Sequence, residues 1–121
     1  MSTNSSIAVK CTDGKYRTIY SHWDGYPDHH MPLLTGFYNS QEMAEKLVKL
    51  GDVSILAESI ECPKGHSFDS PVKGYSVFYK RDRGETRVNC RVRVSYQGCL
   101  NANKQEFNYL WDGEKWTWSK G

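Results

Sequence analysis

The sequence lacks several features that would assign it to a protein class at once. No apolar run approaches the length of a membrane-spanning helix, and residues 1–6 are polar, without the hydrophobic region of a signal peptide. We therefore expect a cytoplasmic protein that has no membrane partner. The formal net charge of +2 is too small to indicate nucleic-acid binding by itself. Any electrostatic argument must depend on where the charges cluster.

Cysteines are few and irregularly spaced. None of the 4 cysteines belongs to a C-x-x-C pair, so the spacing indicates neither a zinc knuckle nor a redox motif. No G-x-S-x-G, Walker or dinucleotide-binding glycine pattern is present. We therefore expect mostly buried, reduced thiols, no catalytic residues and no cofactor. The cysteines are Cys11, Cys62, Cys90 and Cys99.

The histidines also match no recognisable site. All 4 lie in predicted loops, and their spacing to one another and to nearby carboxylates fits no metal-ligand motif. The sequence therefore predicts no metal site, although a zinc or iron site remains an alternative. We interpret these side chains as loop histidines in solvent: His22, His29, His30 and His66.

Aromatic residues are abundant. They make up 13% of the chain, beside 38% hydrophobic and 25% charged residues. This composition is typical of a globular protein with a partly aromatic core. A length of 121 residues predicts a single domain over 1–121, with residues 1–5 as a disordered tail.

Turn signals predict a β-hairpin at each end of the chain. Residues 7–11 and 16–20 flank Asp13-Gly14, and a two-residue turn there would place Lys10 opposite Arg17. Residues 107–111 and 115–118 flank Asp112-Gly113 in the same way. In this second hairpin, the aromatic side chains of both strands should share one face.

Two helices are predicted between these hairpins. The stronger one covers residues 40–50, with Asn39 as N-cap, Glu42 at the capping-box position and Gly51 as the stop. A shorter one covers residues 31–38, with Pro32 tolerated in its first turn.

Further strands are predicted in the second half of the chain, over residues 75–80 and from residue 86. Residues 62–74 have the composition of a loop, and residues 97–104 that of a polar connection. Together these elements predict an α+β fold, an antiparallel β-sheet of about five or six strands with one longer and one short helix packed on one face.

The strand from residue 86 shows the clearest alternation in the chain. Its valines should face one way and Arg87, Arg91 and Arg93 the other. With Lys80, Arg81 and Arg83, these arginines account for six of the 16 basic residues. The pattern indicates either a basic ribbon that meets phosphates or an acidic protein surface, or an ordinary solvated face on which Asp82 and Glu85 pair locally.

Residues 19–27, I-Y-S-H-W-D-G-Y-P, combine a strand end with a tight turn. Pro27 should hold Tyr26 in an extended conformation. His22, Trp23, Asp24 and Tyr26 are then crowded onto a short loop, where they could bind a partner. The alternative is that the two aromatic residues plug the core and Asp24 bonds its own turn amides.

Three short sequence motifs together carry a family resemblance. They are I-Y-S-H-W-D-G-Y-P at residues 19–27, H-S-F-D at 66–69 and F-Y-K-R-D-R-G-E at 78–85. L-G-D at 50–52 and Y-L-W-D-G at 109–113 fit the same pattern. The chain resembles a family of small, functionally uncharacterised bacteriophage and prophage proteins from about Ile7 to Trp118. The arginine-alternating strand between residues 86 and 106 departs from that family's pattern.

The resemblance implies a context in which small phage proteins bind a host macromolecule in the host cytoplasm. Our leading hypothesis is therefore a non-enzymatic protein that binds and modulates a host protein or nucleoprotein complex, for example as an anti-defence (anti-CRISPR-like) inhibitor. The contact residues expected on this hypothesis are Arg83, Arg87, Arg91, Arg93, Trp23 and Tyr26.

Two alternatives remain. One is a small-ligand or hydrolytic site where the H-W-D-G-Y-P, H-S-F-D and R-D-R-G-E loops converge. Its expected residues are His22, Asp24, His66, Asp69, Arg81 and Arg83. The other is direct nucleic-acid binding by the arginine-rich strand.

Overall fold

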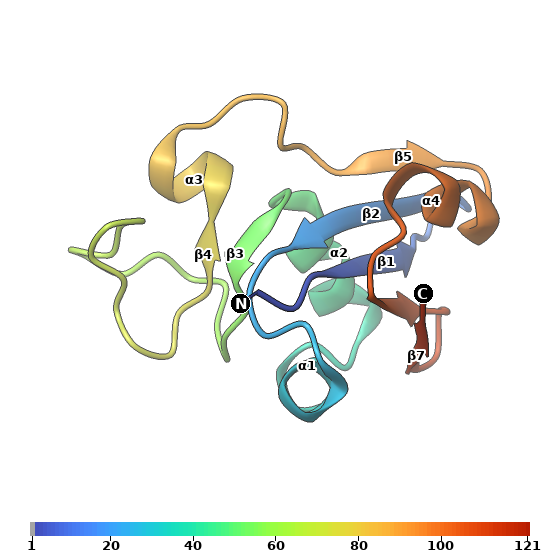
Figure 1. Ribbon diagram of the computed structural model, residues 1–121, viewed down its shortest axis with the longest axis horizontal. Coiled ribbons are helices and arrows are strands. Elements are labelled where there is room, and N and C mark those ends of the chain that lie inside the picture. Colours follow the sequence, from blue (N-terminus) through green and yellow to red (C-terminus); the bar gives the residue numbers. More distant parts are fainter. Residues whose placement is uncertain (1) are drawn as a thin grey trace.

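A computed structural model describes residues 2–121 of the chain (Figure 1). The fold is α+β, with a seven-stranded sheet and four helices. In chain order the elements are β1 (Ser5–Lys10), β2 (Tyr16–Ser21), α1 (Pro27–Phe37), α2 (Gln41–Lys49), β3 (Val53–Ile55), β4 (Val77–Phe78), α3 (Tyr79–Arg83), β5 (Arg91–Arg93), α4 (Tyr96–Asn103), β6 (Phe107–Trp111) and β7 (Trp116–Lys120).

The sheet is mixed, which corrects the prediction of a purely antiparallel one. Its strand order is β4-β3-β2-β1-β6-β7. The seventh strand, β5, pairs with β2 and is not part of this linear order. Both hairpins form as predicted, but β1 and β6 run parallel, as do β2 and β3. The parallel pair β1–β6 places the first and last hairpins side by side, with β7 at the edge of the sheet. Ser5, expected in a disordered tail, is the first residue of β1 and is buried.

Helices cover both faces of the sheet rather than one. Ile7, Ile19 and Tyr109 alternate onto the face that forms the main core with α1 and α2. On the other face, the Nδ2 atom of Asn103 in α4 donates to the hydroxyl of Thr18 at 3.3 Å. Figure 1 shows α1 and α4 on opposite sides of β1 and β2.

The first hairpin differs from its prediction by one residue in register. The Cys11 amide donates to the carbonyl of Lys15, so the turn has three residues instead of two. Ile7 then pairs with Ile19, and Lys10 pairs with Tyr16 rather than with Arg17. The longer turn thereby avoids the opposition of like charges that the two-residue turn would create.

The helix between residues 40 and 50 is confirmed, with a shifted cap. The Ser40 hydroxyl, not Asn39, accepts from the Met43 amide and begins α2. Gly51 follows the helix with φ 88°, a conformation that favours glycine. The other helix, α1, begins at Pro27 rather than at Met31, because Pro27 occupies its first turn.

The region from residue 75 to 104 was predicted least well. The strand expected over 75–80 is reduced to β4, which leads directly into α3. The long alternating strand is reduced to β5, and Val94 is 85% exposed. Arg87 interrupts the alternation with φ 63°, and the Ser95 hydroxyl caps the unpredicted helix α4. Local capping therefore overrides the period-two pattern.

The closing hairpin follows its prediction. Trp111 pairs with Trp116, and Tyr109 pairs with Trp118. Tyr109, Trp111 and Trp116 are buried on the core face, where the Trp116 indole donates to the carbonyl of Tyr38 at 3.0 Å.

Gly25 provides a test of how closely the loop after β2 packs against the N-terminal strand. A Cβ atom on Gly25 would lie 2.7 Å from both the Ser5 Cβ and the Thr3 carbonyl oxygen. Gly25→Ala should therefore lower the free energy of unfolding by about 1–3 kcal/mol in urea denaturation. Gly36, inside α1, has open space around it, so Gly36→Ala should be neutral or stabilising by up to about 1 kcal/mol. Equal effects of the two substitutions would contradict the close packing.

Candidate functional site

Residues 22–26, here called the aromatic loop, join β2 to α1. Neighbouring segments hold their backbone. The amides of His22 and Trp23 donate to the carbonyls of Val53 and Ser54, both at 3.1 Å. The Gly25 amide donates to the Thr3 carbonyl at 2.8 Å. The loop is thus tied to β3 and to the segment that precedes β1.

A fourth bond comes from the far end of the chain. The Tyr109 hydroxyl donates to the Gly25 carbonyl at 2.6 Å, and both residues are buried. Four hydrogen bonds therefore fix a five-residue loop, so its side chains are presented from a rigid backbone.

The side chains of this loop point outward. Trp23 is 42% and Tyr26 is 40% exposed, so the interpretation that they plug the core is wrong. Asp24 is exposed and has φ 55°. His22 accepts or donates at Nδ1 to the Tyr20 hydroxyl at 2.7 Å, and its ring meets that of Trp23 edge-on at 4.6 Å. Two half-exposed aromatic side chains thus lie beside a carboxylate on a rigid loop.

His30 fills the space behind the loop. It belongs to α1 and is fully buried, which corrects the expectation of a solvent-exposed loop histidine. Its Nε2 atom lies 2.9 Å from the Ser21 hydroxyl, and its ring packs 5.3 Å from that of Tyr109. Burial, with a smaller contribution from His29, lowers the pKa of His30 to about 3. The imidazole is therefore neutral in the folded protein at neutral pH.

Residues of the H-S-F-D and R-D-R-G-E motifs lie close together around Asp82. The side chains of Asp82 and His66 are almost completely buried, with His66 Nε2 3.5 Å from Asp82 Oδ2. Arg81 donates to both Asp82 oxygens, from Nε at 2.9 Å and from NH2 at 3.1 Å. The Phe78 amide donates to Oδ2 at 2.8 Å. We call His66, Arg81 and Asp82 the Asp82 cluster.

The polar atoms of this cluster are used internally. His66 Nδ1 accepts from the Val72 amide at 2.9 Å, so Nε2 carries the proton and can donate to the Ser76 carbonyl at 3.1 Å. Burial alone would raise the pKa of Asp82, but the hydrogen bonds from Arg81 and the Phe78 amide keep that pKa below its usual value. Arg81 also donates to the carbonyls of Ile60 and Ser76. The cluster fastens the loop of residues 62–74 to β4 and α3.

Two of the three loops expected to form a ligand site therefore converge. Within residues 2–121, His22 and Asp24 on the aromatic loop form no hydrogen bond or ion pair with the Asp82 cluster, and Asp69 is exposed. Asp82 and Glu85 each pair with a nearby arginine, as the sequence alternative predicted. Asp82 pairs with Arg81, and Glu85 pairs with Arg83 at 2.8 Å.

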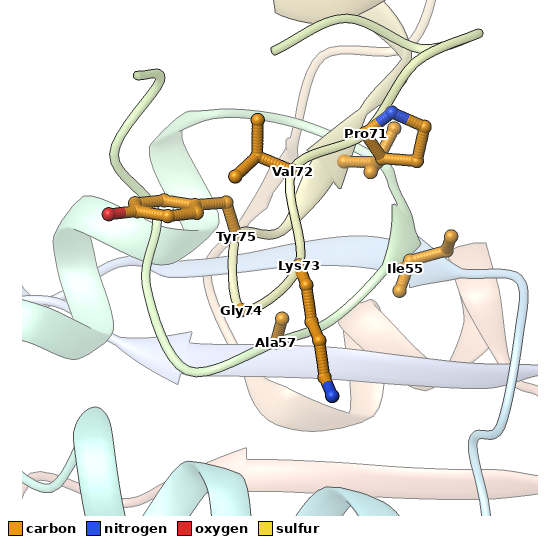
Figure 2. A pocket seen from close by; sticks show the side chains of 8 residues that line it. Ile55, Ala57, Pro71, Val72, Lys73, Gly74 and Tyr75 are labelled. Carbon is orange, nitrogen blue, oxygen red and sulfur yellow. The ribbon is translucent and has the colours of Figure 1, made fainter. Parts of the chain in front are cut away.

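An apolar pocket of about 270 Å³ lies next to this cluster (Figure 2). Its walls come from β3, β4 and the loop that the cluster fastens, and Val72 connects the two features through its amide bond to His66. Only one lining residue, Lys73, carries a charge. No sequence motif indicated this pocket, because its walls come from separate segments. They are Ile55, Ala57, Pro71, Val72, Lys73, Gly74, Tyr75 and Val77.

The four arginines expected to bind a partner differ in their surroundings. Arg83 pairs with Glu85 and lies over the Phe68 ring at 4.3 Å. Arg91 pairs with the buried carboxylate of Asp52 at 3.1 Å. Arg87 and Arg93 are exposed and make no ion pair within residues 2–121. About half of the expected basic ribbon thus serves internal acidic groups.

Asp52 shows why Arg91 is needed inside the fold. Its Oδ1 atom also accepts from the Tyr20 amide at 2.9 Å. Burial raises the pKa of Asp52, and the Tyr20 amide and Arg91 counteract part of that rise. Removal of Arg91 would leave a buried carboxylate without a counter-charge, which is costly.

The two expected contact surfaces lie apart. In Figure 1, β5 runs along one side of β2, whereas α1 and the loop before it lie on the other side of the sheet. The strand β5 and the loop before α1 therefore do not adjoin in this view.

Comparisons with known proteins add no relative. No protein-family model matches the chain, and neither a curated protein nor a solved structure matches it. Within residues 2–121, no group of three or more His, Cys, Asp or Glu side chains is arranged to hold a metal ion. None of the helices in that part of the chain is long and apolar enough to cross a membrane.

The buried imidazole of His30 predicts a pH dependence of stability. Between pH about 6.5 and about 3, the unfolded chain binds a proton at this residue and the folded protein does not. The contribution of His30 to the free energy of unfolding is therefore fully present above that range. It falls on acidification by up to about 1.4 kcal/mol per pH unit. His30→Gln should remove this contribution, so the difference in unfolding free energy between wild type and variant should narrow as the pH falls.

Urea denaturation at several pH values measures this difference. Gly36→Ala, which removes no titratable group, is the control and should leave the slope of the pH profile unchanged. Parallel profiles for wild type and His30→Gln would contradict the assignment.

Proposed function

We propose that this chain is a small phage-encoded, non-enzymatic protein that binds a host macromolecule and modulates it, with the aromatic loop as the primary contact. The observation that carries the proposal is the pairing of a fixed backbone with exposed aromatic side chains. Four hydrogen bonds hold the loop, while Trp23 and Tyr26 remain 42% and 40% exposed.

This combination suits protein recognition for physical reasons. Tryptophan and tyrosine bury large areas on binding, and they are enriched among the residues that dominate interface energies. A loop that is already ordered loses little conformational entropy when its partner arrives. The fold itself contributes the rigidity, because the bonds reach the loop from β3, β6 and the N-terminal segment.

The host as the source of the partner is supported by the resemblance to phage and prophage proteins. Small phage proteins commonly act by binding a host macromolecule, for example by blocking a host enzyme. An anti-defence inhibitor directed at a protein or nucleoprotein complex in the host cytoplasm is the form of this function that we put forward first. Fold alone would not distinguish it from other inhibitors.

The aromatic loop can be tested by affinity capture from host lysate, followed by mass spectrometry. The double variant Trp23→Ala/Tyr26→Ala should lose a partner that the wild type captures, by at least about 2 kcal/mol in binding free energy if the pair forms the centre of the interface. Thermal stability should change little, because both side chains are half exposed.

Phe37→Ala is the matched control, because Phe37 is a 50% exposed aromatic residue at the other end of α1. It should retain the partner. Capture that is equal for the wild type and the double variant would remove the aromatic loop from the proposal.

Nucleic-acid binding is a second candidate, favoured by the two exposed arginines that lack an ion pair. Arg87→Glu/Arg93→Glu should weaken binding to single-stranded DNA and reduce the slope of log affinity against log salt by up to about 1 per lost phosphate contact. Arg91 is unsuitable for this test, since its loss would leave Asp52 without a counter-charge. Weak binding with a flat salt response in the wild type would argue against this candidate.

A small-ligand or hydrolytic function receives less support from the geometry. His66 and Arg81 already use their polar atoms inside the Asp82 cluster. The pocket beside them is apolar apart from Lys73. A hydrolytic site would need groups that are free to contact a substrate.

A further inference from the structure

The end strand β7 has an open edge. It pairs with β6 on one side and is the last strand in the sheet order. An exposed edge carries backbone N–H and C=O groups that can pair with another strand.

The hydrogen-bond pattern of the hairpin shows which residues of β7 present those groups at the open edge. The Asp112 amide donates to Lys115 at 3.1 Å, and the Gly121 amide donates to Glu106 at 2.7 Å. Since bonded and non-bonded pairs alternate along an antiparallel ladder, Thr117 and Ser119 direct their backbone groups toward β6. Trp116, Trp118 and Lys120 direct theirs toward the open edge.

Of the other edge strands, β4 has only 2 residues and β5 is protected, whereas β7 is not. On β5, the same alternation directs the backbone N–H and C=O of Val92 outward. The guanidinium of Arg93 donates a hydrogen bond to that carbonyl at 2.8 Å. β5 also has only 3 residues. β7 has 5 residues, a regular register without a bulge and no proline, and Trp118 at its centre is 47% exposed.

We propose that β7 pairs with the β7 strand of a second copy of this chain. The two strands run antiparallel about a two-fold axis centred on Trp118. This arrangement forms a symmetric dimer in which the two sheets become one continuous sheet. The proposal is independent of the aromatic loop and of its partner.

The sequence of β7 fits its own two-fold image. Trp118 lies opposite the second copy's Trp118, and Trp116 opposite the second copy's Lys120, with outward backbone groups on both members of each pair. Lys115 falls opposite Gly121, so no like charges oppose one another. The two half-exposed tryptophans cover each other on one face, beside Phe107, whose ring lies 5.9 Å from that of Trp118. A second copy satisfies all of these positions at once, as an isologous interface requires.

Sedimentation equilibrium of the full chain over a range of concentrations tests the proposal. The wild type should show a concentration-dependent dimer. Trp118→Pro removes an N–H that faces the open edge and leaves the bonds to β6 in place, as proline does on edge strands. It should be monomeric, with a far-UV circular dichroism spectrum like that of the wild type.

A second variant keeps the test decisive if Trp118→Pro does not fold. Trp118→Lys places two like charges opposite each other at the two-fold axis and should also abolish the dimer. Val92→Pro is the matched control, since it removes an outward N–H from the β5 edge, and it should dimerise as the wild type does. A wild type that is monomeric at every concentration would overturn the proposal. So would a dimer that persists in a folded Trp118 variant.

Discussion

The hydrogen bond from the Tyr109 hydroxyl to the Gly25 carbonyl connects the two ends of the fold. It joins residues that are 84 positions apart in the chain, at 2.6 Å and away from solvent. The parallel pairing of β1 with β6 brings Tyr109 to this position, and the ring of His30 packs against it. The conformation of the aromatic loop therefore depends on the closing hairpin. Because a buried carbonyl without a donor is costly, this bond also discourages other loop conformations.

The distribution of charge follows from two buried carboxylates. Asp82 and Asp52 lie in the interior, and each is met by an arginine and by a backbone amide. A buried carboxylate needs such partners, since its desolvation is expensive. Part of the basic cluster between positions 80 and 93 is thus the counter-charge of the interior rather than a surface for phosphates. The sequence shows the arginines but not the burial of their acidic partners.

What could be predicted from the sequence was local. The two hairpins and α2 were identified because turn pairs, a cap and a glycine stop lie within a few residues of each other. The register of the first hairpin was missed by one residue, because Asp13-Gly14 fits a turn of two or three residues equally well. The parallel β1–β6 pair was not foreseen, since no local pattern specifies which distant strands become neighbours. In the region before α4, alternating valines and arginines suggested a long strand, but the left-handed Arg87 and the Ser95 cap limited it to three residues.

The candidate site was predicted unevenly for the same reason. The loop with Trp23 and Tyr26 could be placed from its turn and proline, but the sequence left open whether the two side chains are exposed. The rigidity of the loop depends on bonds from β3 and β6 that the sequence does not reveal. That rigidity also links the two proposals made for this protein. β7 is paired to β6, and β6 carries the tyrosine that holds the loop. A dimer through β7 would therefore fix two aromatic loops in one assembly. When one loop of the dimer binds a partner with repeated binding sites, the second loop meets the next site at a high effective concentration. The dimer would therefore bind such a partner more tightly than a single loop would.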